Sequence, residues 1–410
     1  MSAPLAPLTT NPNDLCFIDV ETRSWKDVTQ HGAFQHALHG RVTILVYAIG
    51  DEPVKEWVLT DWSPGKKLSW ARAPSDLLAF VDKARAGRGW FVAHNAGFEI
   101  CAFNRAMTGM RFEVHWIIDN MVQATRSHLP ADLMGASLVA KVKAKKQTDG
   151  KRLIKMFADE SLDHTPQTDP EDWERFIDYA RDDVNSMREI FWSTMPLSRR
   201  EWESYWTSER INQRGIQMDV TFVRGAARLA EYAASKANED ITRLTGTADI
   251  TKVTQAARLI DWVRAKLVLL PEVDRILTRE ILEEPGEDGE DVRQVPKYSL
   301  ERTRVEELIA YLERMDEEQG LTDDEYDALQ VLEVRLYGAS ATPKKFEKAL
   351  RMVDDDGCLK GSYVFAGAAA TTRFSSRGVQ QHNLSRATIG GRDDELDAIE
   401  MIAELGETDE

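Results

Sequence analysis

The chain has 410 residues and a formal net charge of −17, with 42% hydrophobic and 30% charged residues. These values are typical of a globular protein with two or three domains. No apolar run approaches the roughly 18–20 residues that a bilayer-spanning helix needs, so a membrane-spanning protein is excluded. The acidic balance argues weakly against a nonspecific nucleic-acid binder, because phosphate contacts need local cations.

The N-terminus and the cysteines both point to the cytoplasm. The first residues, MSAPLAPLTTNPNDL, lack the basic region and the apolar core of a signal peptide. Cys16, Cys101 and Cys358 are scattered, odd in number and without metal-ligand spacing. We therefore expect a reducing compartment and no disulfide framework.

The first half of the chain alternates strand and helix patterns. Runs rich in β-branched or aromatic residues predict strands over 15–20, 42–50, 54–59 and 90–95. Helical periodicity follows near 97–107 and 171–192. This order predicts an α/β domain with a mixed sheet, which ends near Pro196.

The second half is almost entirely helical in pattern up to residue 351. Helices are predicted over 198–213, 220–244, 252–267 and 323–351. Gly215 is expected to end the first of them, and Asp219 to cap the second. The acidic run 283–291 reads as a flexible insertion. Residues 362–386 return to glycine, aromatic and β-branched residues, and an acidic helix is expected after residue 391.

Two carboxylate motifs follow buried strands. Asp19 and Glu21 end the first strand, and residues two apart on a strand face the same side, so their carboxylates converge. Glu99 lies four residues after Asn95, on the same face of the helix that follows the strand 90–95. Taken singly, each motif is better explained by a polar loop or a solvated helix than by a functional site.

The third motif, FIDYARDDVNSM, places Tyr179 and Asp183 on one helix face. Carboxylates from all three motifs, without Cys or His partners, indicate hard cations with oxygen ligands, Mg²⁺ or Mn²⁺. Two such ions can activate a water and stabilise the leaving oxygen of a phosphodiester. Asp19 would bridge the ions, Glu21 and Asp183 would complete one shell, Glu99 would hold the second ion, and the Tyr179 hydroxyl would orient the water.

The motifs DVE, HNAGFE and YARDD resemble those of the DEDD superfamily of 3′–5′ exonucleases, in the subtype with tyrosine in the last motif. The resemblance implies an RNase H-like (DnaQ-like) fold, two metal ions, and catalytic roles for Asp19, Glu21, Glu99, Tyr179 and Asp183. Most members have Asp where this chain has Glu99. Asn95 would contact the nucleic acid.

A basic strip runs through residues 141–157. Lys145, Lys146, Lys151 and Arg152 are predicted to hold substrate phosphates. A solvated basic loop is an equal alternative, because lysine-rich runs are usually surface.

The rest of the chain resembles phage-type family A DNA polymerases. ERINQRGIQMD resembles the junction of exonuclease and thumb, and LTGTADITKVTQAARLIDWV the start of the thumb. GSYVFAGAAATTRFSSRGVQQHNLSR resembles the start of the palm, where Arg373 would touch the primer end and Asn383 the template. Thr372, His382 and Ser385 depart from the usual pattern. The implied domains are an exonuclease over 1–196, a helical DNA-binding thumb over 197–361, and a short β palm fragment with an acidic tail over 362–410.

The metal-binding carboxylates of a polymerase palm do not follow within this sequence, so we expect no DNA synthesis from this chain alone. It would be a subunit of a split polymerase, whose partner chain carries palm and fingers, or a truncated product. Tyr363, Val364 and Phe365 would pair with the partner's strands. The expected activity is removal of mispaired 3′ nucleotides from DNA in a bacterial host cell. Alternatives are a nuclease-weak DNA-binding assembly subunit and an RNase D-like exoribonuclease.

Overall fold

The computed structural model describes residues 8–143, 149–285, 292–338, 343–368, 371–383 and 392–407. They form two compact units. The first combines described residues up to Val220 with those between Lys348 and Thr388, and the second combines Thr221–Glu347 with described residues after Ile389. No helix among the described residues is long and apolar enough to cross a membrane.

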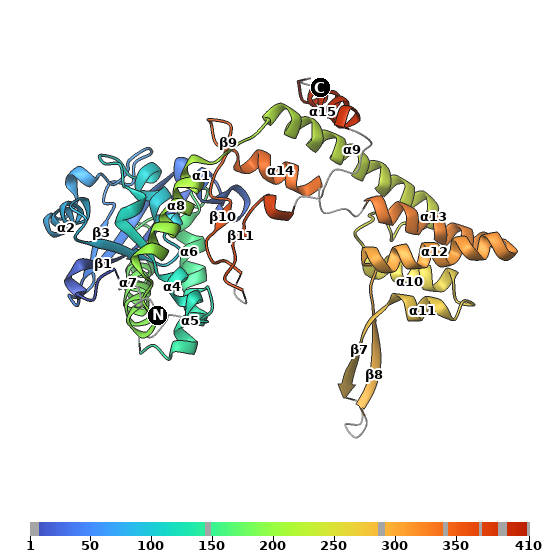
Figure 1. Ribbon diagram of the computed structural model, residues 1–410, viewed down its shortest axis with the longest axis horizontal. Coiled ribbons are helices and arrows are strands. Elements are labelled where there is room, and N and C mark those ends of the chain that lie inside the picture. The colour runs from blue at the N-terminus through green and yellow to red at the C-terminus, as the bar shows by residue number, and fades with distance from the viewer. Residues whose placement is uncertain are drawn as a thin grey trace, which may run out of the picture. The chain divides into compact units, whose positions relative to one another are not determined.

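The first unit is built around a five-stranded mixed sheet (Figure 1). Its strands are β1 (Leu15–Ser24), β2 (Gly40–Ile49), β3 (Lys55–Val58), β4 (Trp90–Ala93) and β5 (Ile117–Asp119), in the spatial order β3-β2-β1-β4-β5. β2 is antiparallel to β1 and β3, whereas β4 runs parallel to β1, and β5 parallel to β4. The predicted mixed α/β sheet is confirmed. The sequence did not predict β5, which has only three residues.

Helices cover this sheet and complete its core. They are α1 (Val28–Leu38), α2 (Ser75–Arg85), α3 (Gly97–Cys101), α4 (Asn120–Arg126), α5 (Leu133–Ala140), α6 (Gly150–Ala158), α7 (Pro170–Ser193) and α8 (Arg199–Arg214). α3 continues as a π-helix (Ala102–Ala106), so the predicted helix 97–107 is α-helical only in its first part. The long α7 starts with Pro170 and two acids in its first turn, which favour a helix N-terminus.

α8 belongs to the first unit, although it follows the predicted domain end at residue 196. Ser198 and Glu201 form a reciprocal capping box at its start. Trp202, Tyr205 and Trp206 are buried in the same core as the sheet, and the Trp206 indole donates to the Ile117 carbonyl at 2.7 Å. Burial of three large aromatic side chains fixes α8 on the α/β core. Gly215 ends the helix with a φ of 79°, as predicted.

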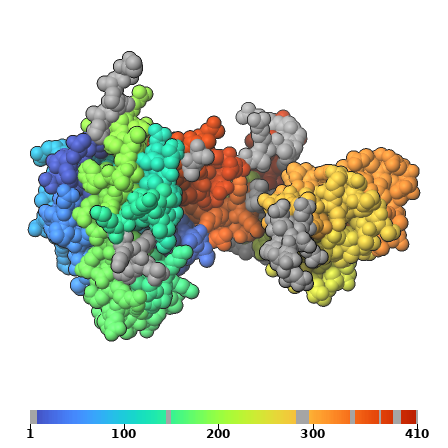
Figure 2. Space-filling view, turned by 90° about the horizontal axis from the view of Figure 1, so that it is seen from below, coloured from blue at the N-terminus to red at the C-terminus, as the bar shows by residue number. Residues whose placement is uncertain are grey.

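The segment after residue 348 also packs within the first unit. Residues of β9 (Cys358–Leu359) pair with β6 (Ile216–Gln217). In the space-filling view, the orange-red segment after residue 348 lies against the teal and green surface of this unit (Figure 2). The Asn212 side chain accepts from the Tyr363 amide and donates to the Tyr363 carbonyl, each at 2.9 Å.

The structure pairs this segment within the chain, and the predicted pairing of Tyr363, Val364 and Phe365 with a partner's strands stays a prediction. β10 (Tyr363–Val364) pairs with β11 (Ser375–Ser376) of the same chain. Phe365 packs edge-on against Tyr205, with ring centroids 5.9 Å apart. Within the chain, Asn212 of α8 binds the backbone of Tyr363, and the Gly367 amide donates to the Val364 carbonyl.

The second unit is mainly helical, as the sequence predicted. Its elements are α9 (Val220–Thr245), α10 (Ala256–Lys266), α11 (Glu272–Leu277), β7 (Thr278–Pro285), β8 (Val292–Tyr298), α12 (Arg302–Gln319), α13 (Asp323–Gly338) and α15 (Arg392–Glu407). β7 and β8 form an antiparallel hairpin that extends from the helices (Figure 1). This hairpin flanks the acidic run, of which residues 286–291 lie outside the described part. The predicted helix 323–351 is two helices, α13 and α14 (Pro343–Met352).

Candidate active site

β1 presents two carboxylates on one side of the sheet. Asp19 and Glu21 are half-buried, whereas Val20 between them is buried, as the alternation of a strand requires. A bulge in the pairing with β2 lies between Glu21 and Thr22. Such irregularities locally re-aim the side chains of a strand.

Glu99 brings a third carboxylate to this place from the first turn of α3. Its side chain is 3% exposed. Burial raises the pKa of Glu99 well above its ordinary value, and the negative charge of Asp19 raises it further, with smaller contributions from Asp119 and Glu21. The Glu99 carboxylate therefore lies within electrostatic reach of both acids of β1.

α7 contributes Tyr179 and Asp183, both buried. The Tyr179 hydroxyl donates a hydrogen bond to the Asp183 carboxylate. Burial and the negative charges of Asp183, Glu21 and Asp19 raise the pKa of Tyr179, so its hydroxyl stays protonated in neutral solution. The structure thus brings together all five residues that the sequence singled out as catalytic.

The carboxylate cluster suits a cation in charge and ligand type. Converging carboxylates repel one another unless protons or metal ions offset their charge. Of the described side chains, no group of three or more His, Cys, Asp or Glu takes up a ready metal-binding arrangement. Glu99 Oε2 is buried and has no hydrogen-bond partner among the described residues. A buried carboxylate oxygen in this position fits a hard cation such as Mg²⁺.

Asp119 supports this cluster and was missed by the sequence reasoning. It is the N-cap of α4, and its carboxylate accepts from the backbone amides of Asn95, Ala96 and Met121 at 2.8–3.0 Å. The first two amides belong to the turn that starts α3, in which Asn95 has a φ of 71°. Asp119 therefore fixes the turn that carries Asn95 and aims Glu99. The strand-end Asp before a helix was the signal that could have identified it.

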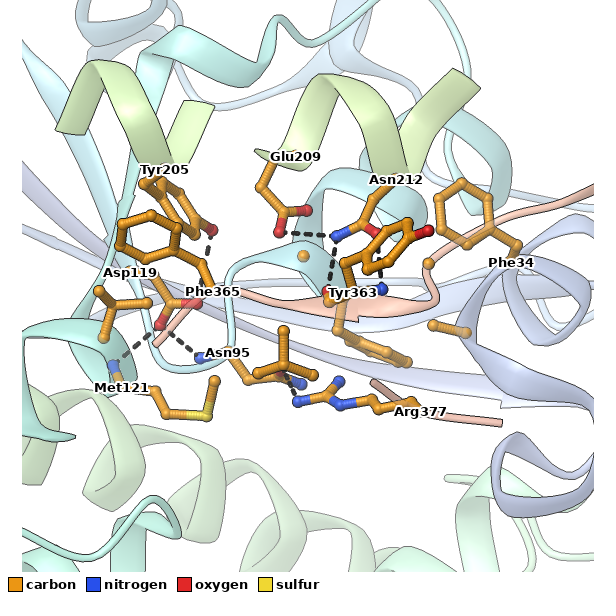
Figure 3. A pocket seen from close by; sticks show the side chains of 16 residues that line it. Phe34, Asn95, Asp119, Met121, Tyr205, Glu209, Asn212, Tyr363, Phe365 and Arg377 are labelled. Carbon is orange, nitrogen blue, oxygen red and sulfur yellow. Dashed lines mark hydrogen bonds between the residues drawn. The ribbon is translucent and has the colours of Figure 1, made fainter. Parts of the chain in front are cut away.

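A small cavity of about 50 Å³ lies beside this turn (Figure 3). Asn95, Asp119, Glu209, Asn212 and Arg377 contribute polar groups to its lining. The Arg377 guanidinium donates to Asn95 Oδ1 at 3.0 Å. This bond connects the segment that follows β11 to the turn that starts α3.

Glu209 makes the stability of the first unit depend on pH. Burial, and then the negative charge of Asp119, raise the pKa of Glu209 from 4.5 to about 7, although Asn212 and Arg377 act in the opposite direction. The raised pKa means that folding favours the neutral acid. Its contribution to stability is complete below pH 4.5 and is lost as the pH rises through 7.

We therefore expect Glu209→Gln to raise the free energy of unfolding by about 3 kcal/mol at pH 8 and by less than about 1 kcal/mol at pH 5. Urea unfolding of both proteins at the two pH values measures the difference. Glu203→Gln, on the exposed side of α8, is the matched control and should show no such pH-dependent gain. Equal stability of Glu209→Gln and the parent at pH 8 would contradict the assignment.

The predicted nucleic-acid contacts are in different surroundings. Lys151 is exposed on α6, and Arg373 and Asn383 are exposed after β10. The Arg152 guanidinium is bound to the carboxylates of Asp149 and Asp172. Lys145 and Lys146 lie outside the described residues. Phosphate binding by these side chains stays a prediction.

Comparison with known proteins gives one extensive similarity. A DNA polymerase of Bacillus phage SP02 is 27% identical over 385 residues, which are 91% of this chain and 51% of the phage protein. The chain thus spans about half the length of the curated relative it matches. No protein-family model matches it.

Two solved structures show weaker likeness. The polymerase domain of Pol1 from M. smegmatis, in complex with DNA primer-template and dNTP, has a TM-score of 0.45 and 15% identity over 92% of this chain and 53% of its own. A nuclease in its apo form has a TM-score of 0.25 and 14% identity over 49% of this chain and 81% of its own. The sequence similarity to the phage enzyme, which runs through nearly the whole chain, confirms the predicted resemblance to a phage DNA polymerase.

Proposed function

We propose that the protein is a 3′–5′ exonuclease, with an RNase H-like first unit, that removes nucleotides from the 3′ end of DNA in proofreading. The convergence of Asp19, Glu21, Glu99 and Asp183 from three separate elements, with Tyr179 bonded to Asp183, carries this proposal. Bringing like charges together costs electrostatic free energy unless a cation offsets it. Metal-assisted hydrolysis is the chemistry that uses such an arrangement.

The four carboxylates would hold two Mg²⁺ or Mn²⁺ ions. Such ions lower the pKa of a bound water and neutralise charge on a phosphodiester. The raised pKa of Glu99, caused by burial and by neighbouring carboxylates, and its buried Oε2 atom support this role.

Tyr179 would act as a donor that orients the attacking water, and not as a base. Its raised pKa keeps the hydroxyl protonated, and its bond to Asp183 sets the direction of the hydroxyl. Asn95, held by Asp119 and Arg377, would contact the terminal nucleotide with its side-chain amide.

The second unit would grip DNA as the thumb, and the exposed Arg373 and Asn383 would meet primer and template at the start of a palm. Polymerisation would then need palm and fingers from a partner chain or from sequence beyond this chain. In the cytoplasm of a bacterial host, the protein would serve phage DNA replication.

Digestion of end-labelled single-stranded oligonucleotides tests the proposal. In the presence of Mg²⁺, we expect stepwise release of nucleoside monophosphates from the 3′ end, and none in EDTA. The same oligonucleotide blocked at its 3′ end is the matched control. Internal cleavage, or digestion of RNA in preference to DNA, would contradict the proposal.

A further inference from the structure

Tyr179 is contacted by a second helix, α6, whose first residue is a glycine. A Cβ atom on Gly150 would lie 2.2 Å from Cε2 of Tyr179 and 2.9 Å from its Cζ. Gly150 is buried, and its φ lies outside the left-handed region that favours glycine. Glycine is therefore required here because there is no room for a Cβ atom beside the phenol ring, and not because of the backbone conformation.

α6 is also connected to the Tyr179 ring through stacked aromatic side chains. Phe176, one turn before Tyr179 on α7, stacks on it with centroids 6.4 Å apart and planes 16° from parallel. Phe157 of α6 stacks on Phe176 at 5.4 Å and 15°. Because stacked rings transmit a displacement to their neighbours, a shift of α6 would move the ring of Tyr179.

Ion pairs fasten the first turn of α6 to the first turn of α7. Arg152 of α6 donates to Asp149 at 2.9 Å and to Asp172 of α7 at 2.7 Å. Arg175 of α7 pairs with the same two carboxylates. An exposed pair is worth little alone, but a network with a bridging guanidinium fixes one geometry. On α7, this ion-pair network begins at Asp172, two helical turns before Tyr179.

We propose that the first turn of α6 positions the Tyr179 hydroxyl. Gly150 packs against the tyrosine ring, and the ion pairs of Arg152 hold this turn on α7. This inference rests on the proposed exonuclease function, in which Tyr179 orients the attacking water. Arg152, taken from the sequence as a phosphate contact, then serves catalysis through Tyr179 and is a positioning residue.

A double-mutant cycle tests the contact. Gly150→Ala is expected to lower kcat by about 10²-fold with KM unchanged, because a displacement near 1 Å in a reacting site has that effect. In a Tyr179→Phe background, the same substitution should cause no further loss, since the hydroxyl is already absent. An equal loss in both backgrounds would overturn the proposal.

Arg152→Met keeps the proposal testable if Gly150→Ala fails to fold. We expect a loss of about 10-fold in kcat that disappears in the Tyr179→Phe background, with KM and its salt dependence unchanged. A phosphate contact predicts the opposite pattern, a salt-dependent rise in KM that persists without the hydroxyl, and this result would overturn the proposal.

Fluorine NMR of a fluorotyrosine at position 179 gives a readout that needs no activity. Arg152→Met should shift its resonance, whereas Lys155→Met, an exposed lysine on the same helix, should not. If Arg152→Met shifts the fluorine resonance but the parent protein has no nuclease activity, the proposed function is refuted and the contact between α6 and Tyr179 is supported. An unchanged resonance would overturn the contact itself.

Discussion

Asp19→Ala is expected to reduce the release of 3′ nucleotides at least about 10³-fold in the presence of Mg²⁺. Metal coordination is worth several kcal/mol of transition-state stabilisation, and each 1.36 kcal/mol corresponds to about a factor of ten in rate. The charge of Asp19 acts on Glu99 of α3 and on Tyr179 of α7, so this residue is electrostatically coupled to both helices of the proposed site. Single-turnover digestion of a 3′-labelled oligonucleotide measures the loss.

The same substitution should not weaken the fold. Asp19 raises the pKa of Glu99, so its removal relieves repulsion, and we expect an unchanged or higher Tm in metal-free buffer. Asp178→Ala is the matched control, because Asp178 is exposed on α7 and pairs with Arg181. It should keep full activity. If Asp19→Ala digests DNA as fast as the parent does, the site assignment is wrong.

The position of each carboxylate within its own element was predictable because the signals are local. The period of two in a strand puts Asp19 and Glu21 on one side, and a spacing of four puts Tyr179 and Asp183 on one helix face. That the three motifs meet was inferred from their carboxylates and order within one α/β domain and from the resemblance to a known superfamily, since periodicity alone does not say which elements are neighbours.

What the sequence missed depends on partners that are distant along the chain. The sequence predicts that Arg152 is a free cation, whereas in the structure it is paired with Asp172, twenty residues later. Tyr363 and Val364 read as exposed strand edges until Asn212 and β11 satisfy them. Asp119 carries only a local capping signal and Glu209 carries none, and their roles arise from burial and from contacts with other elements. Such pairings depend on tertiary packing, which local propensity does not encode.

A buried cluster of charges holds the segment 354–360 to the first unit. Asp354 is 7% exposed, and its carboxylate accepts two hydrogen bonds from the Arg105 guanidinium, at 3.0 and 2.5 Å. Lys360, also buried, donates to it at 2.6 Å. The two cations and their hydrogen bonds lower the pKa of Asp354 to about 2, against the effect of burial.

Asp354→Asn is expected to lower the free energy of unfolding by about 3–5 kcal/mol, because it leaves Arg105 and Lys360 buried without their shared counter-charge. The lowered pKa gives the sign of the pH dependence. The contribution of Asp354 is complete above its ordinary pKa of 3.8 and is lost as the pH falls through 2. The deficit of the variant should therefore be constant between pH 5 and 8 and should shrink in acid.

Asp356→Asn is the matched control, since Asp356 binds the same Lys360 at 2.6 Å from an exposed position. An exposed pair contributes up to about 1 kcal/mol, so the control should lose little stability. Urea unfolding of both variants separates the two cases, and equal losses would show that burial of the charge is not the cause. Because Arg377, which bonds to Asn95, follows this cluster along the chain, Asp354→Asn should also expose residues 371–377 to proteolysis before global unfolding.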